Sequence, residues 1–316
     1  SSVNAYTPIN ELELWYDATN TDGNNNLDYQ NGDKIDTWKD LSGKGNHVYQ
    51  SDESKKPVIA LNSNKQYLRF DGYNDSLEAN FSGHILDDPS GQNVTIFTVV
   101  KPKGGMYILS SGGQSSHARG YALSYQDYVG INSFSTFKDL NGDKEISIVN
   151  SFTVNQTNLV MHSYDGSYTN VNVLVNGGNE SHVNHTRGSA SNDYQSLTIG
   201  RPNNVADHYG NFEIAEVIVL SSTDSQKITD IQNYLSNKWA LSATVDSDGD
   251  GLMDSDDPEP TIPLVAWYQF NDSSDLGKDS SGFENNLSIY NNEIVNYSTN
   301  ASEGVGSAEF DGGSTF

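Results

Sequence analysis

Five aspartates between residues 246 and 257 have the spacing of a loop that binds a divalent metal ion. The carboxylates in this pattern, Asp-x-Asp-x-Asp-Gly-x-x-Asp-x-x-Asp, belong to Asp246, Asp248, Asp250, Asp254 and Asp257. Alternate carboxylates on a turning loop can point inward together, and Ca²⁺ takes about six to eight oxygen ligands. Gly251 permits the sharp turn, and Leu252 can add its backbone carbonyl. Because five uncompensated carboxylates would repel one another, the pattern predicts bound Ca²⁺; the alternative is a solvated acidic linker.

A second polar loop near the start of the chain offers oxygen ligands at similar intervals. Its members fall at the first, third, fifth, seventh, ninth and twelfth positions and are Asp22, Asn24, Asn26, Asp28, Gln30 and Asp33. This spacing is similar to that of an EF-hand loop, which binds Ca²⁺ through those positions. Leu27 replaces the usual glycine, and the last ligand is Asp rather than Glu. A polar turn built from Asn and Asp explains the same residues, so both interpretations stay open.

The elements that must position these loops have the pattern of β-strands. Short apolar or alternating runs, separated by Gly, Asn, Asp and Ser, recur through the first 220 residues. Their length, number and spacing predict an antiparallel sandwich. The pair Asn176-Gly177 predicts a hairpin turn. The expected strands are Leu12–Tyr16, Tyr67–Phe70, Val94–Val100, Met106–Leu109, Ile146–Val149, Leu159–Tyr164, Val171–Val175, Leu197–Gly200 and Phe212–Leu220.

One helix is expected after the last of these strands. Thr223 and Gln226 have the spacing of a capping box, with Thr223 as the N-cap. An apolar stripe at helical spacing follows, which can lie against the sandwich; its members are Ile228, Ile231, Leu235 and Trp239. We expect this helix to close the first domain near Leu241.

The composition restricts the classes of partner. The chain has 316 residues, 34% of them hydrophobic, and a formal net charge of −25 from 42 acidic and 17 basic residues. Nucleic acid and anionic membranes are poor partners, because no basic stripe exists to displace phosphate counterions. The chain has no cysteine and no apolar run long enough to span a membrane. Its start lacks a leader pattern, so we expect an extracellular protein whose signal peptide has been removed.

Three short segments recur in the same order on both sides of the aspartates, which indicates a duplicated domain. The paired segments are residues 14–17 and 266–270, 40–46 and 279–285, and 68–72 and 308–312. We therefore expect a first domain at 1–242, an acidic calcium-binding linker at 243–262 and a partial second domain at 263–316. The second copy stops early, so we expect neighbouring modules in a longer polypeptide.

These segments resemble the laminin G-like, concanavalin A-like jelly roll of bacterial surface and polysaccharide-handling proteins. The shared landmarks are a Trp-Tyr strand at 15–16, an Asp-x-Ser-Gly-x-x-Asn turn at 40–46, a Phe-Asp-Gly-x-x-Asp hairpin at 70–75, an Ile-Gly-Arg strand at 199–201 and a last strand at 213–219. The five aspartates are similar to the calcium repeats of thrombospondin type 3. The resemblance implies an all-β fold, a two-sheet antiparallel jelly-roll sandwich with one helix after its last strand.

The resemblance also suggests where a ligand could bind. Jelly rolls of this kind can place a metal ion near a ligand rim at the turn that contains Asp71, Asn74 and Asp75. Tyrosines on loops can stack on sugar faces, and so can Trp38, for which a core position is the alternative. The candidate ligand-binding residues are Trp38, Asp71, Tyr73, Asn74 and Asp75.

Catalysis is not expected. Glycosidases need two carboxylates across the scissile bond, whereas Glu213 and Glu216 lie three residues apart on a strand and should face opposite sides. The chain has neither a His-Glu-x-x-His metal motif nor a Gly-x-Ser-x-Gly nucleophile turn. The sequence therefore predicts no enzyme.

Together these features predict a calcium-dependent extracellular module for recognition or adhesion. It would bind a glycan or a surface protein, as part of a larger bacterial surface protein. Two alternatives stay open: a carbohydrate-binding appendage of a secreted polysaccharide-degrading enzyme, and a purely structural spacer or filament subunit.

Overall fold

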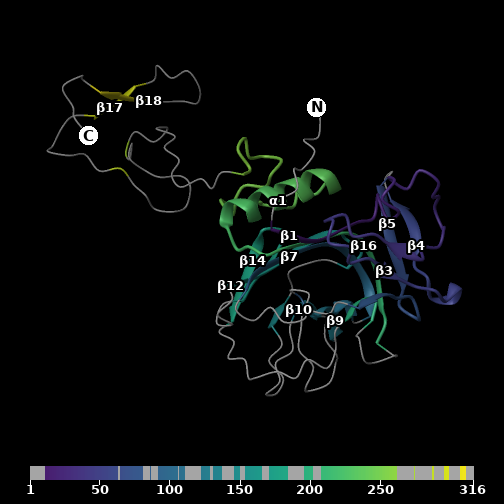
Figure 1. The fold of residues 1–316 in the computed structure, drawn as a ribbon. Helices are drawn as coiled ribbons and strands as arrows, with labels where there is room; N and C mark the ends of the chain where they lie inside the picture. Colours follow the sequence, from purple (N-terminus) through teal and green to yellow (C-terminus); the bar gives the residue numbers. More distant parts are fainter. Residues whose placement is uncertain are drawn as a thin grey trace.

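The computed structural model places two antiparallel β-sheets face to face, with one long helix on the outside of the first (Figure 1). The predicted two-sheet sandwich with a helix after its last strand is confirmed. The structure describes residues 11–62, 65–80, 86, 92–105, 107–110, 122–128, 131–136, 146–149, 154–165, 171–183, 196–201, 208–261, 274, 287, 295–298 and 307–310.

The first sheet is built around its last strand, β16. In spatial order it contains β14 (Gly178–Val183), β13 (Val171–Val175), β12 (Asn158–Asp165), β7 (Asn93–Gly105), β16 (Gly210–Leu220), β5 (Lys65–Asp71) and β4 (Val58–Asn62). β1 (Leu12–Asp17) also pairs with β16, along the half of that strand that β5 leaves free. The Asn176-Gly177 pair joins β13 to β14 with positive φ at both residues, as the predicted hairpin requires.

The second sheet contains several strands that the pattern did not predict. Its order is β11 (Ile146–Val149), β10 (Ile131–Thr136), β9 (Ala122–Tyr128), β8 (Tyr107–Ser110), β15 (Ser196–Ile199), β6 (Leu77–Asn80), β3 (Val48–Tyr49) and β2 (Thr37–Trp38). A short 3-10 turn, η1 (Glu53–Lys55), connects β3 to β4. All nine expected strands are present within a few residues of their predicted ends. Most of the unpredicted ones are short or polar, so their alternation is weak.

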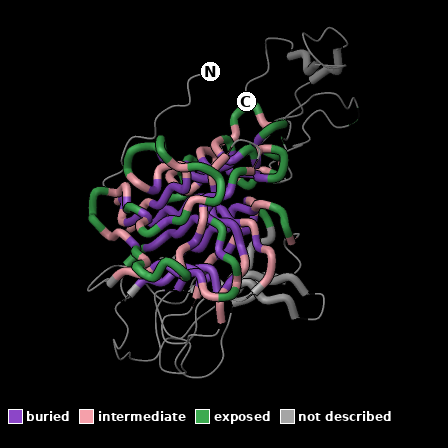
Figure 2. The backbone as a smooth tube through the Cα atoms, turned by 90° about the vertical axis from the view of Figure 1, so that its right-hand side faces the viewer, coloured by how far each residue is buried: buried purple, intermediate pink, exposed green. Residues whose placement is uncertain are grey.

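The main core fills the space between the sheets, where Figure 2 shows the buried segments concentrated. Tyr16, Trp38, Phe70 and Phe212 lie in it with almost no exposed surface. The rings of Phe70 and Phe212 stack with their centroids 4.7 Å apart. At about 25 cal/mol per Å² of apolar surface buried, aromatic side chains of this size are major contributors to the stability of the sandwich.

A second apolar cluster joins the helix to the outer face of the first sheet. Helix α1 (Ser225–Trp239) buries Ile231, Leu235 and Trp239, while Ile228 is partly buried, so the predicted stripe is confirmed. The predicted N-cap is wrong by one residue. Asp224, not Thr223, caps the helix, because its side chain accepts a hydrogen bond from the Lys227 backbone N–H at 3.0 Å.

A β-bulge in β16 corrects the predicted placement of its two glutamates. The register shifts between Ile214 and Glu216, so Ala215 is an extra residue and the alternation of faces is interrupted. Glu213 and Glu216 therefore lie on the same, helix-covered face. Both are buried: Glu213 pairs with two lysines of β7, and Glu216 pairs with Lys238 of α1.

Little of the expected second domain falls within the described residues. β17 (Val295–Ser298) pairs with β18 (Ser307–Phe310) in a two-stranded antiparallel sheet. The repeated segments at 266–270 and 279–285 lie outside the described residues, as does Trp267. The predicted boundaries at 242 and 262 stay predictions.

Candidate metal centre

The segment after α1 turns back and packs against the sandwich. Val245 is fully buried in the cluster beneath the helix. The backbone N–H of Asp246 donates to the carbonyl of Asn176, at the tip of the β13–β14 hairpin, at 3.1 Å. Gly177 lies so close that a Cβ atom built on it would be 1.6 Å from the Asp246 carbonyl oxygen. The hairpin tip therefore fixes where the aspartate loop, residues 246–257, begins.

Three of the five predicted carboxylates converge at the start of this loop. One carboxylate oxygen from each of Asp246, Asp248 and Asp250 lies within 4.8 Å of the other two. Two oxygens bound to one Ca²⁺ lie about 2.3–2.6 Å from the ion, so they are at most about 5 Å apart. The spacing of these three side chains, the aspartate triad, is compatible with ligands of a single cation.

Local hydrogen bonds bend the loop into this shape. The two carboxylate oxygens of Asp246 accept from the backbone N–H groups of Gly249 and Gly251 at 2.8 and 2.9 Å. Asp248 accepts from the N–H of Asp250, and Asp250 from that of Leu252. The two glycines have φ values of +79° and +94°, which disfavour residues with a Cβ. Each aspartate thus turns the chain over itself, and the spacing of two residues brings the carboxylates together.

The electrostatics of the triad favour a bound cation. The pKa of Asp248 is raised to about 6, chiefly by burial and also by the charges of Asp250, Asp257 and Asp246. Burial also raises the pKa of Asp246, with Asp250 adding to the effect. The Oδ2 atom of Asp248 is buried and accepts no hydrogen bond. A cation would pair this oxygen and remove the repulsion, and three carboxylates are the hard oxygen donors that Ca²⁺ prefers. The residues present therefore fit the ion.

The remaining predicted ligands of the loop have other positions. Both carboxylate oxygens of Asp254 accept from Ser247, one from its N–H and one from its hydroxyl, at 2.8 Å each. Asp257 accepts from the N–H of Glu259. Leu252 contributes its N–H to Asp250. Asp254 closes the base of the loop through Ser247, and neither it nor Asp257 belongs to the triad.

The second predicted loop does not bring its carboxylates together. Within the described residues, the triad is the only place where three acidic or histidine side chains converge. Asp22 accepts from the N–H groups of Asn24 and Asn26, and Asp33 accepts from that of Gln30. Asn26 is buried, with its amide bonded to Thr21, Ala18 and Gln66. Asp28 is exposed. The hydrogen bonds are those of a polar turn.

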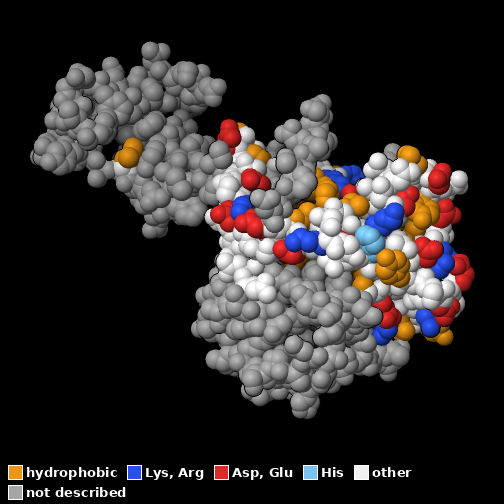
Figure 3. Space-filling view, in the orientation of Figure 1, with side chains coloured by type: hydrophobic (Ala, Val, Ile, Leu, Met, Phe, Trp, Pro, Cys, Tyr) orange, Lys and Arg blue, Asp and Glu red, His pale blue; other side chains and the backbone are white. Residues whose placement is uncertain are grey.

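The turn between β5 and β6 holds four of the candidate ligand-binding residues. Asp71 accepts from the N–H groups of Tyr73 and Asn74, and Asp75 accepts from that of Asp71. Burial, with the neighbouring charge of Asp71, raises the pKa of Asp75 to about 6. The Tyr73 side chain is 80% exposed. Figure 3 shows that exposed hydrophobic side chains are interspersed with charged ones on the described part of one face.

Trp38 is not a sugar platform. Its side chain has no exposed surface, and its ring lies against that of Tyr16 with centroids 5.1 Å apart. Its Nε1–H donates to the carbonyl of Asp17 at 3.0 Å. Of the two positions considered for Trp38, the core position is the one it has, because the two-residue strand β2 pairs with β3 and directs this side chain inward.

Two residues that shape the metal centre were not predicted from the sequence to contact it. Gly177 was predicted only as a turn residue, although it also contacts the aspartate loop. Gln232 of α1 donates to the carbonyl of Ser247 and holds the loop from the other side. In the sequence, the only feature that indicates a buried position for Gln232 is that it follows Ile231 on the helix. That feature does not identify Ser247, fifteen residues away, as its partner.

Comparisons with known proteins show a fold and no family. No protein-family model matches the chain, and no curated protein matches it. Trypanosoma rangeli sialidase in complex with sialic acid is similar in structure, with 14% identity and a TM-score of 0.50 over 74% of this chain and 34% of that one. The chain thus spans about a third of the sialidase, and the likeness is one of β-sandwich fold.

Two toxin structures are similar at slightly lower scores. The binding domain of Paraclostridial Mosquitocidal Protein 1 matches with 14% identity and a TM-score of 0.48, over 72% of this chain and 53% of that one. A botulinum neurotoxin type C structure, whose cell entry is described as dependent upon two ganglioside molecules, matches with 16% identity and a TM-score of 0.48, over 71% and 51%. Among the described residues, no helix is both long and apolar enough to cross a membrane.

Proposed function

We propose that this chain is a calcium-dependent, non-catalytic recognition module of an extracellular protein, and that its ligand is a glycan. The observation that carries the proposal is the aspartate triad, with three carboxylate oxygens within 4.8 Å and one buried oxygen without a hydrogen-bond partner. A bound Ca²⁺ would supply positive charge at this point. The chain itself supplies the ligands and, through Asn176 and Gln232, ties the loop that carries them to the sandwich.

Ion binding would stabilise the arrangement of the loop. In its absence the triad concentrates negative charge, and the pKa of Asp248 is raised, chiefly by burial and further by the charges of the neighbouring aspartates. Anything that binds the folded form alone stabilises it by mass action. We therefore assign calcium a structural role that connects the loop with the recognition surface, in a parent protein of the laminin G-like and thrombospondin-repeat type.

Two observations support glycan recognition over catalysis. The two glutamates considered as a glycosidase pair, Glu213 and Glu216, are both buried and paired with lysines, Glu213 with Lys101 of β7 and Glu216 with Lys238 of α1. Two exposed tyrosines, Tyr49 of β3 and Tyr73 of the turn after β5, offer faces on which sugar rings can stack.

Calorimetric titration with CaCl₂ tests the metal site directly. We expect the chain to bind Ca²⁺ more tightly than Mg²⁺, because carboxylates on a pliant loop suit the larger ion. Asp248→Asn removes a triad charge and should weaken Ca²⁺ binding about tenfold or more. Asp256→Asn is the matched control, since Asp256 is exposed on the same loop and lies outside the triad. Equal affinities for the two variants would contradict the assignment.

A glycan array with and without chelator tests the recognition function. We expect binding to a restricted set of glycans in Ca²⁺ and a loss of signal after chelation or in Asp248→Asn. If calorimetry shows that the protein is loaded with Ca²⁺ and the array still gives no signal, glycan recognition is rejected. The chain would then be a calcium-binding spacer.

A further inference from the structure

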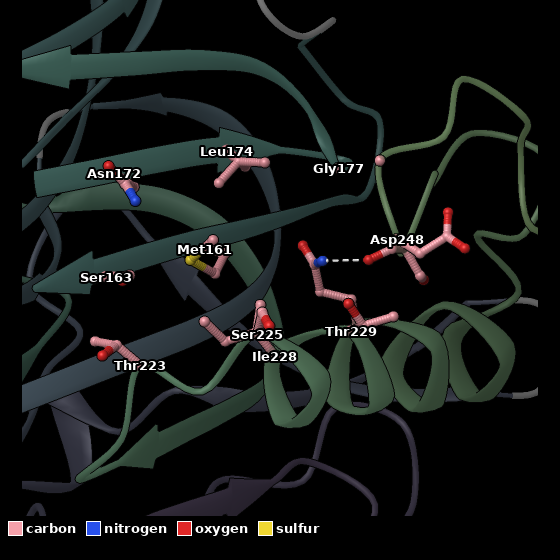
Figure 4. A pocket seen from close by; sticks show the side chains of 13 residues that line it. Met161, Ser163, Asn172, Leu174, Gly177, Thr223, Ser225, Ile228, Thr229 and Asp248 are labelled. Carbon is pink, nitrogen blue, oxygen red and sulfur yellow. Dashed lines mark hydrogen bonds between the residues drawn. The ribbon is translucent and has the colours of Figure 1, made fainter. Parts of the chain in front are cut away.

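A cavity of about 560 Å³ lies beside the aspartate loop, three residues of which line it (Figure 4). It is bounded by the outer face of β12 and β13, by the first half of α1 and by the loop residues 247–249. Met161, Leu174 and Ile228 form an apolar part of its lining, and Thr229 and Gln232 contribute polar groups. Its size falls within the range of about 300–1,000 Å³ that is usual for small-molecule sites. We call it the helix-side cavity.

The lining of the helix-side cavity contains a buried hydrogen-bond acceptor without a partner. Gln232 is 4% exposed. Its Nε2 donates to the carbonyl of Ser247 at 2.7 Å, the bond drawn as a dashed line in Figure 4, which fixes the orientation of the amide. Its Oε1 makes no hydrogen bond. A buried acceptor left unpaired is costly, and a hydroxyl group of a ligand in the cavity would satisfy it.

The charge of the lining selects the class of ligand. Among the described residues that line the cavity, none is Lys, Arg or His, so an anion would find no counter-charge there. The one ionisable group is Asp248, and Figure 4 shows its carboxylate turned away from Met161 and Leu174. A purely apolar ligand would leave Gln232 unsatisfied. Hydroxyl and amide groups beside a small apolar surface match a neutral sugar, which presents both hydroxyls and a C–H face.

From these contacts we infer that the helix-side cavity binds one neutral, polyhydroxylated sugar residue, and that metal loading of the triad holds one wall of the cavity in place. The second part rests on the proposed calcium binding. The aspartate loop contributes to both sites: its carboxylates form the triad, and its Ser247 carbonyl accepts the hydrogen bond from Gln232 in the cavity lining. Ser247 in turn is fixed by Asp254 through two hydrogen bonds. Disorder in the loop would therefore remove a wall of the cavity.

Methyl groups of methionine report on both sites in one sample. The chain contains three methionines. Met161 lines the cavity, and Met253 lies within the aspartate loop. In protein labelled with ¹³C at the methionine methyls, we expect the Met253 resonance to move on addition of CaCl₂. We then expect the Met161 resonance to move on addition of methyl glycosides of neutral hexoses, with dissociation constants in the millimolar range. Met161→Leu and Met253→Leu variants assign the two signals.

Two substitutions on α1 separate the cavity from the helix surface. Ser225 lines the cavity and is exposed, so Ser225→Trp should fill part of the cavity and weaken glycoside binding about tenfold or more. Asp230→Trp is the matched control on an exposed position outside the lining. Chelation should weaken glycoside binding about fivefold or more, the size of ordinary coupling between two sites.

The outcomes distinguish the two proposals. A Met253 response to CaCl₂ without any Met161 response to neutral glycosides overturns the cavity assignment and leaves the metal site intact. A Met161 response that Ser225→Trp does not reduce, or tighter binding of a methyl sialoside than of neutral glycosides, also overturns it. In a third outcome, the Met161 resonance responds to neutral glycosides and Ser225→Trp abolishes this response, but the Met253 resonance does not move on addition of CaCl₂. That outcome supports the sugar site and rejects the role of the metal.

Discussion

Replacing Gly177 by alanine should separate the aspartate loop from the hairpin tip that anchors it. A Cβ at this position would lie 1.6, 2.6 and 3.1 Å from the carbonyl oxygen, the carbonyl carbon and the nitrogen of Asp246. All three are backbone atoms, so no change of rotamer can relieve the overlap. Because non-bonded heavy atoms rest about 3.5 Å apart, the start of the loop must retreat by about 2 Å.

The expected cost has two parts. Gly177 has a φ of +79°, and an L-residue in this conformation costs roughly 1–2 kcal/mol. Displacing the loop also breaks the hydrogen bond from the Asp246 N–H to Asn176, worth about 1 kcal/mol. Gly177→Ala should therefore lower the free energy of unfolding by about 2–3 kcal/mol. A retreat of about 2 Å also exceeds the roughly 0.2 Å tolerance of metal–ligand distances, so Ca²⁺ affinity should fall about tenfold or more.

Gly45→Ala is the matched control. Gly45 has the same φ of +79°, and nothing lies within 4 Å of a Cβ built on it. It should therefore show only the backbone cost of roughly 1–2 kcal/mol and bind Ca²⁺ normally. Urea denaturation in chelator measures stability, and calorimetry measures metal affinity. If the two variants unfold at the same urea concentration and bind Ca²⁺ equally, the contact between the hairpin tip and the loop does not position the metal centre.

Three further predictions concern buried charges. The pKa of Asp248 is about 6, and Ca²⁺ binds the ionised form. Calorimetry should therefore show Ca²⁺ affinity falling about tenfold between pH 7 and pH 5. An affinity that does not change with pH would exclude Asp248 as a ligand. Asp75 has a folded pKa of about 6, above its unfolded value, so its contribution to stability is favourable in acid and is lost as the pH rises through 6. In urea denaturation, the free energy of unfolding of Asp75→Asn should exceed that of the wild type by about 1–2 kcal/mol at pH 8. At pH 4 the two proteins should be equally stable. The Nζ atom of Lys238 lies 2.7 Å from a carboxylate oxygen of Glu216. Lys238→Met should lower the free energy of unfolding by about 3–5 kcal/mol, because it leaves that carboxylate buried without a counter-charge. Adding Glu216→Gln to this variant should restore part of the lost stability in the same assay.

The sequence predicted the elements whose signals are local. Alternation located the nine long or apolar strands, and the stripe ending at Trp239 located the helix face. The spacing of Asp246, Asp248 and Asp250 also predicted their convergence, because each carboxylate bonds to an N–H only two to five residues ahead. Such contacts join residues that are close in the sequence, so they can be predicted without knowing the fold.

Features set by distant partners were not predictable in this way. Glu216 shares a face with Glu213 because Ala215 is inserted opposite β7, and the local pattern carries no sign of the bulge. Trp38 is buried because its two-residue strand pairs with β3. Asn26 has the spacing of a metal ligand, but its amide is bonded to Gln66, forty residues away. In each case a tertiary contact overrides a local pattern.

The position of β16 has a consequence for synthesis on the ribosome. This strand is the last of the sandwich to emerge, yet it occupies the middle of the first sheet, between β7 on one side and both β5 and β1 on the other. Until residues 210–220 are available, those three earlier strands have exposed edges, which are prone to pair with other chains. The first sheet therefore cannot be completed until its final strand is synthesised, and a truncation before residue 210 would leave three unjoined parts: β14 to β7, the β4–β5 pair and β1.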